Sequence, residues 1–272
     1  MMHSRNQLPS QPYNLHDSSR RDTELSPTTP WTAAADSQNT ESQRTESQSD
    51  VQFWQVNDFS AGTIPESYEP RYAYPLVVWL TGKDCGIDDS LNHIAAMSPQ
   101  NYLGLAVDEC LFERPDSDQH DFDMPVEFLK RLVDVENRVV NAVRSVRQVL
   151  NVHTERIFLA GAGDAASVAL LLAMHQPEWF GGCIAFGGAF PSAAKLLANK
   201  DELAGKRFYL GAPGGRSAWQ TTGSVRNSAR QLVAAGADVS VSVNASETDS
   251  LVNRQALREV DQWIISGILA DA

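Results

Sequence analysis

Several short segments of this chain are apolar without interruption, and they constrain the fold more than any other feature. Every residue in 76–80 is apolar, and the stretches 157–160 and 183–186 are similar. A strand with one face in water alternates apolar and polar residues, whereas a continuously apolar strand has both faces covered. The sequence therefore predicts a mostly parallel central sheet with helices on both faces, joined by right-handed crossovers.

Apolar runs and helical patterns alternate along the chain at the spacing of a βαβ protein. Strands are expected at 51–56, 74–80, 102–107, 156–160, 182–186, 207–210 and 238–243. Helices are expected at 88–97, 126–150, 164–175, 193–203, 224–235 and 253–269. The fold class is therefore α/β.

The clearest helix is 126–150, because its apolar residues recur mostly at intervals of three and four. Such a stripe is typical of a helix that covers a sheet. The stripe consists of Leu129, Leu132, Val133, Val139, Val140, Val143, Val146 and Leu150.

Composition divides the chain into two parts. Residues 1–50 are rich in Ser, Gln, Thr, Asn and Pro, with few aliphatic residues and no sustained period. Such a segment does not bury enough apolar surface to offset the entropy of ordering. We therefore expect a disordered polar N-terminal tail at 1–50 and one α/β domain at 51–272.

The charge balance limits the partners. A formal net charge of -12 opposes binding to nucleic acid and to anionic membranes. No apolar run approaches the roughly 18 residues of a spanning helix, so membrane insertion is not expected. The interpretation is a cytoplasmic protein whose partner is an unidentified small molecule or protein.

The cysteines indicate a reducing compartment. Cys85, Cys110 and Cys183 are odd in number and form no close pair, so free thiols are expected. They also lack the spacing of a tetrahedral metal site. We expect neither a metal nor a cofactor.

Two blocks of sequence resemble a known family. Residues 69–82 resemble the segment that leads to the oxyanion turn of carboxylesterase and phospholipase type α/β-hydrolases. Residues 152–161 and 169–180 resemble the strand, helix and turn around the nucleophile of the same superfamily. The resemblance covers roughly residues 51–270. It implies an α/β-hydrolase fold without a lid domain and, in the family, ester hydrolysis by a Ser-Asp-His triad.

The nucleophile slot of that triad holds no nucleophile. The family places its serine in a Gly-x-Ser-x-Gly elbow, and the resemblance places that serine at Gly163. Ser167 lies about one helical turn further on and is expected to pack on the side of the helix. Glycine offers no side chain to attack a carbonyl.

The acid and base slots are also changed. The family's acid follows the strand 207–210, where Gly214 is the best match and no carboxylate stands nearby. The family's histidine falls in the loop at 245–251, near Ser250, and no histidine occurs after His175. The three slots Gly163, Gly214 and Ser250 are therefore vestigial.

The oxyanion hole depends less on side chains, because backbone N–H groups form it. By the resemblance, those donors come from Lys83 and Asp164. The hole is expected to persist as a shape in a shallow cleft.

Two hypotheses remain open. In the first, the chain is a pseudoenzyme, a non-catalytic α/β-hydrolase-fold protein that binds a ligand or a partner. In the second, it is an active hydrolase of carboxylic esters or similar bonds with displaced residues. There Asp164 is the nucleophile of an elbow shifted by one, flanked by the small residues Ala162 and Ala166. A glycine-rich nucleotide site at 161–166 is weaker, because Ala166 replaces the third glycine of that motif.

Overall fold

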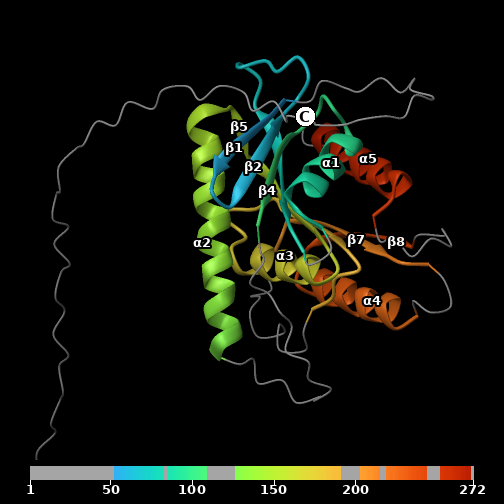
Figure 1. Ribbon diagram of the computed structural model, residues 1–272. Helices are drawn as coiled ribbons and strands as arrows, with labels where there is room; N and C mark the ends of the chain where they lie inside the picture. The colour runs from blue at the N-terminus through green and yellow to red at the C-terminus, as the bar shows by residue number, and fades with distance from the viewer. Residues whose placement is uncertain are drawn as a thin grey trace, which may run out of the picture. The chain divides into compact units, whose positions relative to one another are not determined.

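An eight-stranded sheet forms the centre of the protein in the computed structural model (Figure 1). The structure describes residues 52–82, 85–108, 126–190, 203–214, 219–243 and 252–270, all within one compact unit. The strands are β1 (Gln52–Asn57), β2 (Ser60–Ile64), β3 (Tyr74–Leu80), β4 (Leu103–Val107), β5 (Val152–Ala162), β6 (Gly182–Phe186), β7 (Arg207–Ala212) and β8 (Asp238–Val243). Their order across the sheet is β1-β2-β4-β3-β5-β6-β7-β8.

The sheet is mostly parallel, as predicted. Only β2 is antiparallel to its neighbours, β1 and β4, and the pairs from β4 through β3 to β8 are all parallel. The sequence analysis missed β2 because its turn carries no glycine or proline. Instead, Asn57 Oδ1 accepts hydrogen bonds from the Phe59 N–H at 2.9 Å and from Ser60 Oγ at 2.8 Å, which closes the hairpin.

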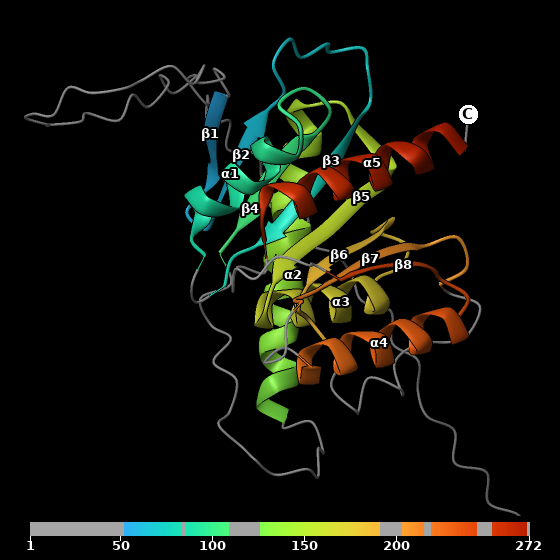
Figure 2. The same cartoon turned by 90° about the vertical axis from the view of Figure 1, so that its right-hand side faces the viewer.

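Helices cover both faces of this sheet (Figures 1 and 2). The helices are α1 (Ile87–Met97), α2 (Val126–Val149), α3 (Asp164–His175), α4 (Trp219–Ala234) and α5 (Arg254–Ala270). One apolar cluster joins α2, α3 and α4 to one face, and a second joins α1 and α5 to the other. Within the described parts of the chain, no separate domain interrupts the order of strands.

Strand β3 illustrates why the continuously apolar runs belong in the middle. Leu76, Val78 and Leu80 pack in the cluster with α2 and α3, whereas Val77 and Trp79 pack in the cluster with α1 and α5. All five side chains are 0% exposed. Both faces of the strand are shielded from water, so the burial of each of these side chains stabilises the fold.

Helix α2 packs on the sheet along a stripe that differs slightly from the predicted one. Val133 is 50% exposed and was wrongly placed in the stripe, because it lies about 100° around the helix from Leu132. The side chain of Leu129 lies outside the described residues. The buried stripe consists of Leu132, Val135, Val139, Ala142, Val143 and Val146.

Some element boundaries also differ from the predictions. Strand β5 begins four residues before its predicted start, because Val152 pairs with Tyr74 of β3. The Tyr74 N–H donates to Asn151 O at 2.9 Å. Helix α4 begins five residues early, and Thr222 in its first turn donates to Pro213 O at 3.0 Å. The helix predicted at 193–203 and the tail at 1–50 lie almost wholly outside the described residues.

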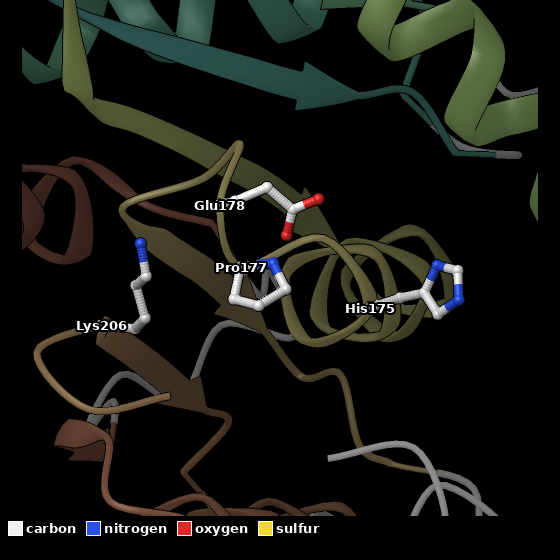
Figure 3. Close-up of a pocket in the computed structure, with 4 residues that line it drawn as sticks. All are labelled: His175, Pro177, Glu178 and Lys206. Atoms are coloured by element: carbon white, nitrogen blue, oxygen red, sulfur yellow. The ribbon is translucent and has the colours of Figure 1, made fainter. Parts of the chain in front are cut away.

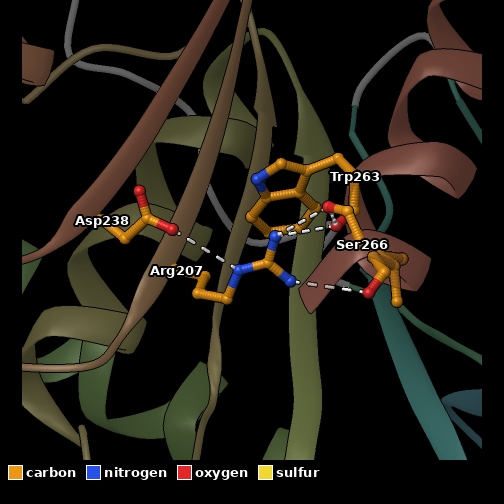
Figure 4. Close-up of polar contacts among 5 residues, drawn as sticks. Arg207, Asp238, Trp263 and Ser266 are labelled. Atoms are coloured by element: carbon orange, nitrogen blue, oxygen red, sulfur yellow. Dashed lines mark hydrogen bonds and ion pairs between the residues drawn. The ribbon is translucent and has the colours of Figure 1, made fainter. Parts of the chain in front are cut away.

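Polar contacts at Arg207 hold α5 on the sheet (Figure 4). The guanidinium carbon of Arg207 lies 4.5 Å from the centre of the Trp263 ring, and Nη2 donates to Trp263 O at 2.7 Å. Arg207 Nε lies 3.6 Å from a carboxylate oxygen of Asp238, whose side chain is 65% exposed. An added Cβ at Gly267 would overlap the same guanidinium, so Arg207 would have to move away from Trp263.

Two tyrosines anchor α5 in the same way. Tyr102 Oη donates to Asp261 Oδ1 at 2.6 Å, and Tyr209 Oη donates to Glu259 Oε2 at 3.1 Å. Burial, more than the adjacent carboxylate, raises the pKa of Tyr102 well above its usual range and that of Tyr209 to about 12. Both phenols therefore stay protonated and keep donating.

We predict that Arg207→Met lowers the free energy of unfolding by about 2 kcal/mol, because the charged hydrogen bond to Trp263 O is lost. Urea denaturation measures this. The matched control is Asp238→Asn, whose exposed ion pair contributes little. Equal losses in the two variants would contradict the assignment.

We also predict that Glu259 makes stability depend on pH. The hydrogen bond from Ser242 Oγ at 2.6 Å is the main cause that lowers the pKa of Glu259 below 4.5. A carboxyl with a lowered folded pKa stabilises the fold above its unfolded pKa, and this contribution disappears as the pH falls through the folded pKa. The stability difference between the parent and Glu259→Gln should therefore shrink in acid. A difference that stays constant in thermal melts down to pH ~3 would contradict this prediction.

Candidate functional site

The resemblance places its site at the carboxyl edge of the parallel strands. The segments that leave this edge are Thr81 and Gly82 after β3, Gly163 after β5, Gly187 and Gly188 after β6, and Pro213 and Gly214 after β7. Adjacent segments are tied by backbone hydrogen bonds. Gly163 N donates to Phe186 O at 2.8 Å, and Gly187 N donates to Gly211 O at 2.7 Å.

The turn between β5 and α3 is as sharp as a nucleophile elbow. Gly163 adopts φ 61° and ψ −123°, a backbone conformation that only glycine adopts readily. At Gly161, an added Cβ would lie 2.8 Å from the backbone carbon of Ala165. At Gly188, it would lie 2.6 Å from Ala166 Cβ. The absence of side chains at both positions lets α3 leave the sheet at once.

Gly163 itself points toward open space. An added Cβ there would meet no atom within 4 Å, so the turn has room for a side chain that the sequence lacks. Ser167 does not replace it, because its Oγ accepts a hydrogen bond from Ala189 N at 3.1 Å and lies on the side of α3. This contact agrees with the packing role predicted for Ser167.

Asp164, the alternative nucleophile, is the exposed first residue of α3. It follows the strained position and is itself helical, so the elbow is centred on Gly163. A carboxylate in the first turn also stabilises the positive end of the helix dipole, which is a structural reason for an acidic residue there.

The other predicted slots are only partly described. Gly214 lies just beyond β7, two strands from β5 at the same edge. Ser250 and Lys83 lie outside the described residues, as does Cys110. The structure thus brings Gly163 and Gly214 to one edge, and the placement of Ser250 and Lys83 stays a prediction.

The loop after β3 lies against the elbow. An added Cβ at Gly82 would stand 3.6 Å from Ala165 Cβ and 3.8 Å from Ala162 O. Thr81 donates from Oγ1 to Asp108 Oδ1 at 3.1 Å. This bond fixes the end of β3 to the end of β4.

A thiol and an imidazole meet beside this loop, and the sequence analysis did not connect them. Cys85 Sγ lies 3.9 Å from His93 Nδ1 and 3.4 Å from Ser90 Oγ. Cys85 is half-buried, whereas Cys183 is fully buried, and both are free thiols as predicted. The spacing of Ser90 and His93 on α1 was the available signal, because residues three apart share a helix face.

Burial sets the protonation of this pair. It is the largest cause that raises the pKa of the Cys85 thiol and the largest that lowers the pKa of His93. Asp89 raises both pKa values, and the hydrogen bond between Ser90 and Cys85 lowers that of Cys85. At neutral pH the pair is therefore an uncharged thiol beside an uncharged imidazole.

A groove of about 440 Å³ lies at the opposite edge of the sheet (Figure 3). Its lining residues His175, Pro177, Glu178 and Lys206 come just before β6 and β7, at the amino ends of these strands. His175 Nδ1 lies 3.1 Å from a carboxylate oxygen of Glu136, which gives this histidine a structural role. This groove is not part of the elbow site.

The described residues show neither a metal cluster nor a membrane span. They contain no group of three His, Cys, Asp or Glu side chains placed to hold a metal ion. None of the helices described is both long and apolar enough to cross a membrane.

No protein family model matches the chain, and no curated protein matches its sequence. The fold, in contrast, is similar to that of solved esterases. The crystal structure of a Bacillus cereus carboxylesterase matches with a TM-score of 0.59 at 16% identity, covering 81% of this chain and 96% of that one. A ferulic acid esterase of Anaeromyces mucronatus gives 0.56 at 12%, covering 83% and 95%. A fungal esterase of Rhizomucor miehei gives 0.54 at 13%, covering 82% and 84%.

These likenesses show that the chain has the α/β-hydrolase fold, as the sequence blocks implied. At such low sequence identity these similarities show only the fold, because function resides in the site and not in the scaffold.

The geometry of the elbow predicts unequal effects of two alanine substitutions. Gly163→Ala should lower the free energy of unfolding by about 2 kcal/mol, because alanine must adopt the strained conformation. Gly161→Ala should lower it further or prevent folding, since its Cβ would press on the backbone of α3. Thermal denaturation measures both.

Gly86→Ala is the matched control. Gly86 has φ −76°, and an added Cβ meets no atom within 4 Å, so little change is expected. If Gly163→Ala were as harmless as Gly86→Ala, the strained elbow would be wrong.

Proposed function

We propose that this protein is a non-catalytic member of the carboxylesterase and phospholipase type of α/β-hydrolases, which binds a small molecule or a partner protein at the carboxyl edge of its sheet. The observation that carries the proposal is Gly163. It has the backbone conformation of a nucleophile elbow and open space for a side chain, yet it has no side chain.

The other two slots of the triad support this proposal. Gly214 stands where the family has its acid, and the sequence has no histidine after His175. In a Ser-Asp-His triad, the histidine moves the proton and the acid orients it, so losing all three groups removes the proton path for acyl transfer. A single loss would leave room for a variant mechanism.

Binding in the absence of chemistry requires that the edge keep its shape, and backbone groups supply that shape. We infer an oxyanion-like pair of N–H donors from Lys83 and Asp164. The first N–H groups of a helix such as α3 have no intrahelical acceptor, so they suit a carbonyl or carboxylate group of a ligand.

The second candidate is an active ester hydrolase in which Asp164 is the nucleophile. Its exposure next to the elbow favours this candidate. Against it, Asp164 is the first residue of α3 and no histidine lies downstream to activate water. Asp164→Asn separates the two functions, because it abolishes turnover only in the second.

We also infer the setting of the protein from its composition. A polar tail over residues 1–50 would precede the domain at 51–272, and three cysteines without a close pair favour the reducing cytoplasm. Protease digestion that removes the tail and leaves the domain intact would support the first inference.

The proposal predicts no turnover of short-chain aryl esters and no stoichiometric labelling by a fluorophosphonate probe. Esterase assays and intact mass spectrometry measure these two quantities. Turnover that a single side-chain substitution removes would overturn the non-catalytic assignment.

A converse experiment restores Gly163→Ser, Gly214→Asp and Ser250→His together. We expect weak esterase activity, because the elbow has room for a side chain at residue 163. The matched control restores the acid and the histidine but keeps Gly163. No activity in a triple variant with an unchanged circular dichroism spectrum would contradict the retained geometry of the edge.

A further inference from the structure

The described residues place one nucleophilic group with a base at the carboxyl edge, and it is outside the three triad slots. Cys85 Sγ lies 3.9 Å from His93 Nδ1, within reach of a hydrogen bond to sulfur, and 3.4 Å from Ser90 Oγ. The His93 ring in turn lies against the ring of Trp79, with 5.0 Å between centroids. Trp79 is fully buried, so His93 has a fixed support.

The thiol is joined to the elbow by a short path. Gly82 and Cys85 exchange two backbone hydrogen bonds, of 3.1 Å from Gly82 N and 3.3 Å from Cys85 N. A Cβ added at Gly82 would come within 4 Å of Ala162 and Ala165, which stand on either side of the elbow glycine. Cys85 therefore belongs to the loop that contacts the elbow.

The protonation of the pair suits general-base chemistry. A neutral imidazole has a lone pair on the nitrogen that faces the thiol when Nδ1 is unprotonated, and an uncharged thiol has a proton to give. The Ser90 hydroxyl, which donates to Gly86 O at 2.8 Å, is a second polar group at the sulfur. Burial raises the pKa of Cys85, so attack by its sulfur requires that His93 take the thiol proton as the new bond forms.

Cys183 provides an internal contrast. It is fully buried in β6 and burial raises its pKa far above the usual range, so it is inert. Cys85 is half-buried and sits in a loop beside polar groups. Packing alone explains the position of Cys183, but it does not explain why an imidazole lies beside Cys85.

We propose that Cys85 and His93 form a nucleophile–base pair that accepts an acyl group from an activated carboxylic ester. His93 Nδ1 takes the thiol proton, and Sγ attacks the carbonyl carbon to form a tetrahedral oxyanion. The oxyanion collapses, the bond from the carbonyl carbon to the leaving oxygen breaks, and the imidazolium returns the proton to that oxygen. The products are an acyl thioester on Cys85 and a free alcohol.

This acyl transfer goes beyond the proposed function, which concerns binding at an edge whose triad is lost. It needs neither Gly163, Gly214 nor Ser250.

The test incubates the full chain with p-nitrophenyl acetate and follows release of nitrophenolate and the mass of each cysteine peptide. We expect a burst of one equivalent, with acetyl on Cys85 only. The reaction should be faster than that of N-acetylcysteine at the same pH. Cys85→Ser should abolish the burst. Acetylation at Cys110 or Cys183 instead, or a rate at Cys85 no faster than that of the model thiol, would overturn the proposal.

His93→Gln tests the base. It should slow acetylation of Cys85 by about 100-fold, the lower range for general-base catalysis, while Cys85 stays present. His175→Gln, at the opposite edge, is the matched control and should leave the rate unchanged. If circular dichroism shows that His93→Gln unfolds the chain, two other comparisons replace it. These are the acetylation rate of the Ser90→Ala variant and the rate of the parent protein relative to N-acetylcysteine. An equal rate in a folded His93→Gln variant would overturn the role of His93.

The outcomes separate this inference from the proposed function. A burst on Cys85 without turnover supports both. A burst followed by turnover that Cys85→Ser removes supports the pair and overturns the non-catalytic assignment. No burst and no turnover overturns the pair and leaves the proposed function intact.

Discussion

The carboxyl edge of the sheet depends on the sharp turn at Gly163. Strand β5 lies inside the sheet, so α3 must leave it within one residue, and the glycines at 161 and 188 let the helix approach. The strained conformation at residue 163 is costly for any residue with a Cβ and almost free for glycine. In the proposed non-catalytic protein, glycine at this position would remove the chemistry and relieve the strain, so the turn could persist without a catalytic role.

The stability of the rest of the fold depends little on the residues that catalysis would require. Two dry faces of the sheet and the anchors of α5 at Arg207, Tyr102 and Tyr209 hold the layers together. None of these groups belongs to a triad slot. Gly214 stands in a segment that follows a strand, where side chains add little to packing. A scaffold of this kind keeps its shape without catalytic groups in those slots, and the proposed pair of Cys85 and His93 lies beside them.

The sequence predicted those parts of the structure that follow from local pattern. Continuously apolar runs predicted the two-sided sheet, and the resemblance of residues 152–161 and 169–180 to the α/β-hydrolases predicted the elbow. Strand β2 escaped because its hairpin depends on the Asn57 side chain and not on a glycine turn. The predicted stripe of α2 was wrong at Val133. A spacing of three or four residues also admits the residue next to a buried one, and the helix turns that residue toward solvent. The spacing of Ser90 and His93 places them on one face of α1, but their contact with Cys85 depends on how the loop after β3 meets that helix.

If the fold keeps the elbow conformation without a nucleophile, a crystal structure of the Gly163→Ser variant should show an unchanged turn. We expect residue 163 to retain φ near 61°, with the serine hydroxyl in the open space and α3 unmoved. A backbone that relaxes to negative φ at residue 163, with a displaced α3, would show that the elbow conformation is not retained.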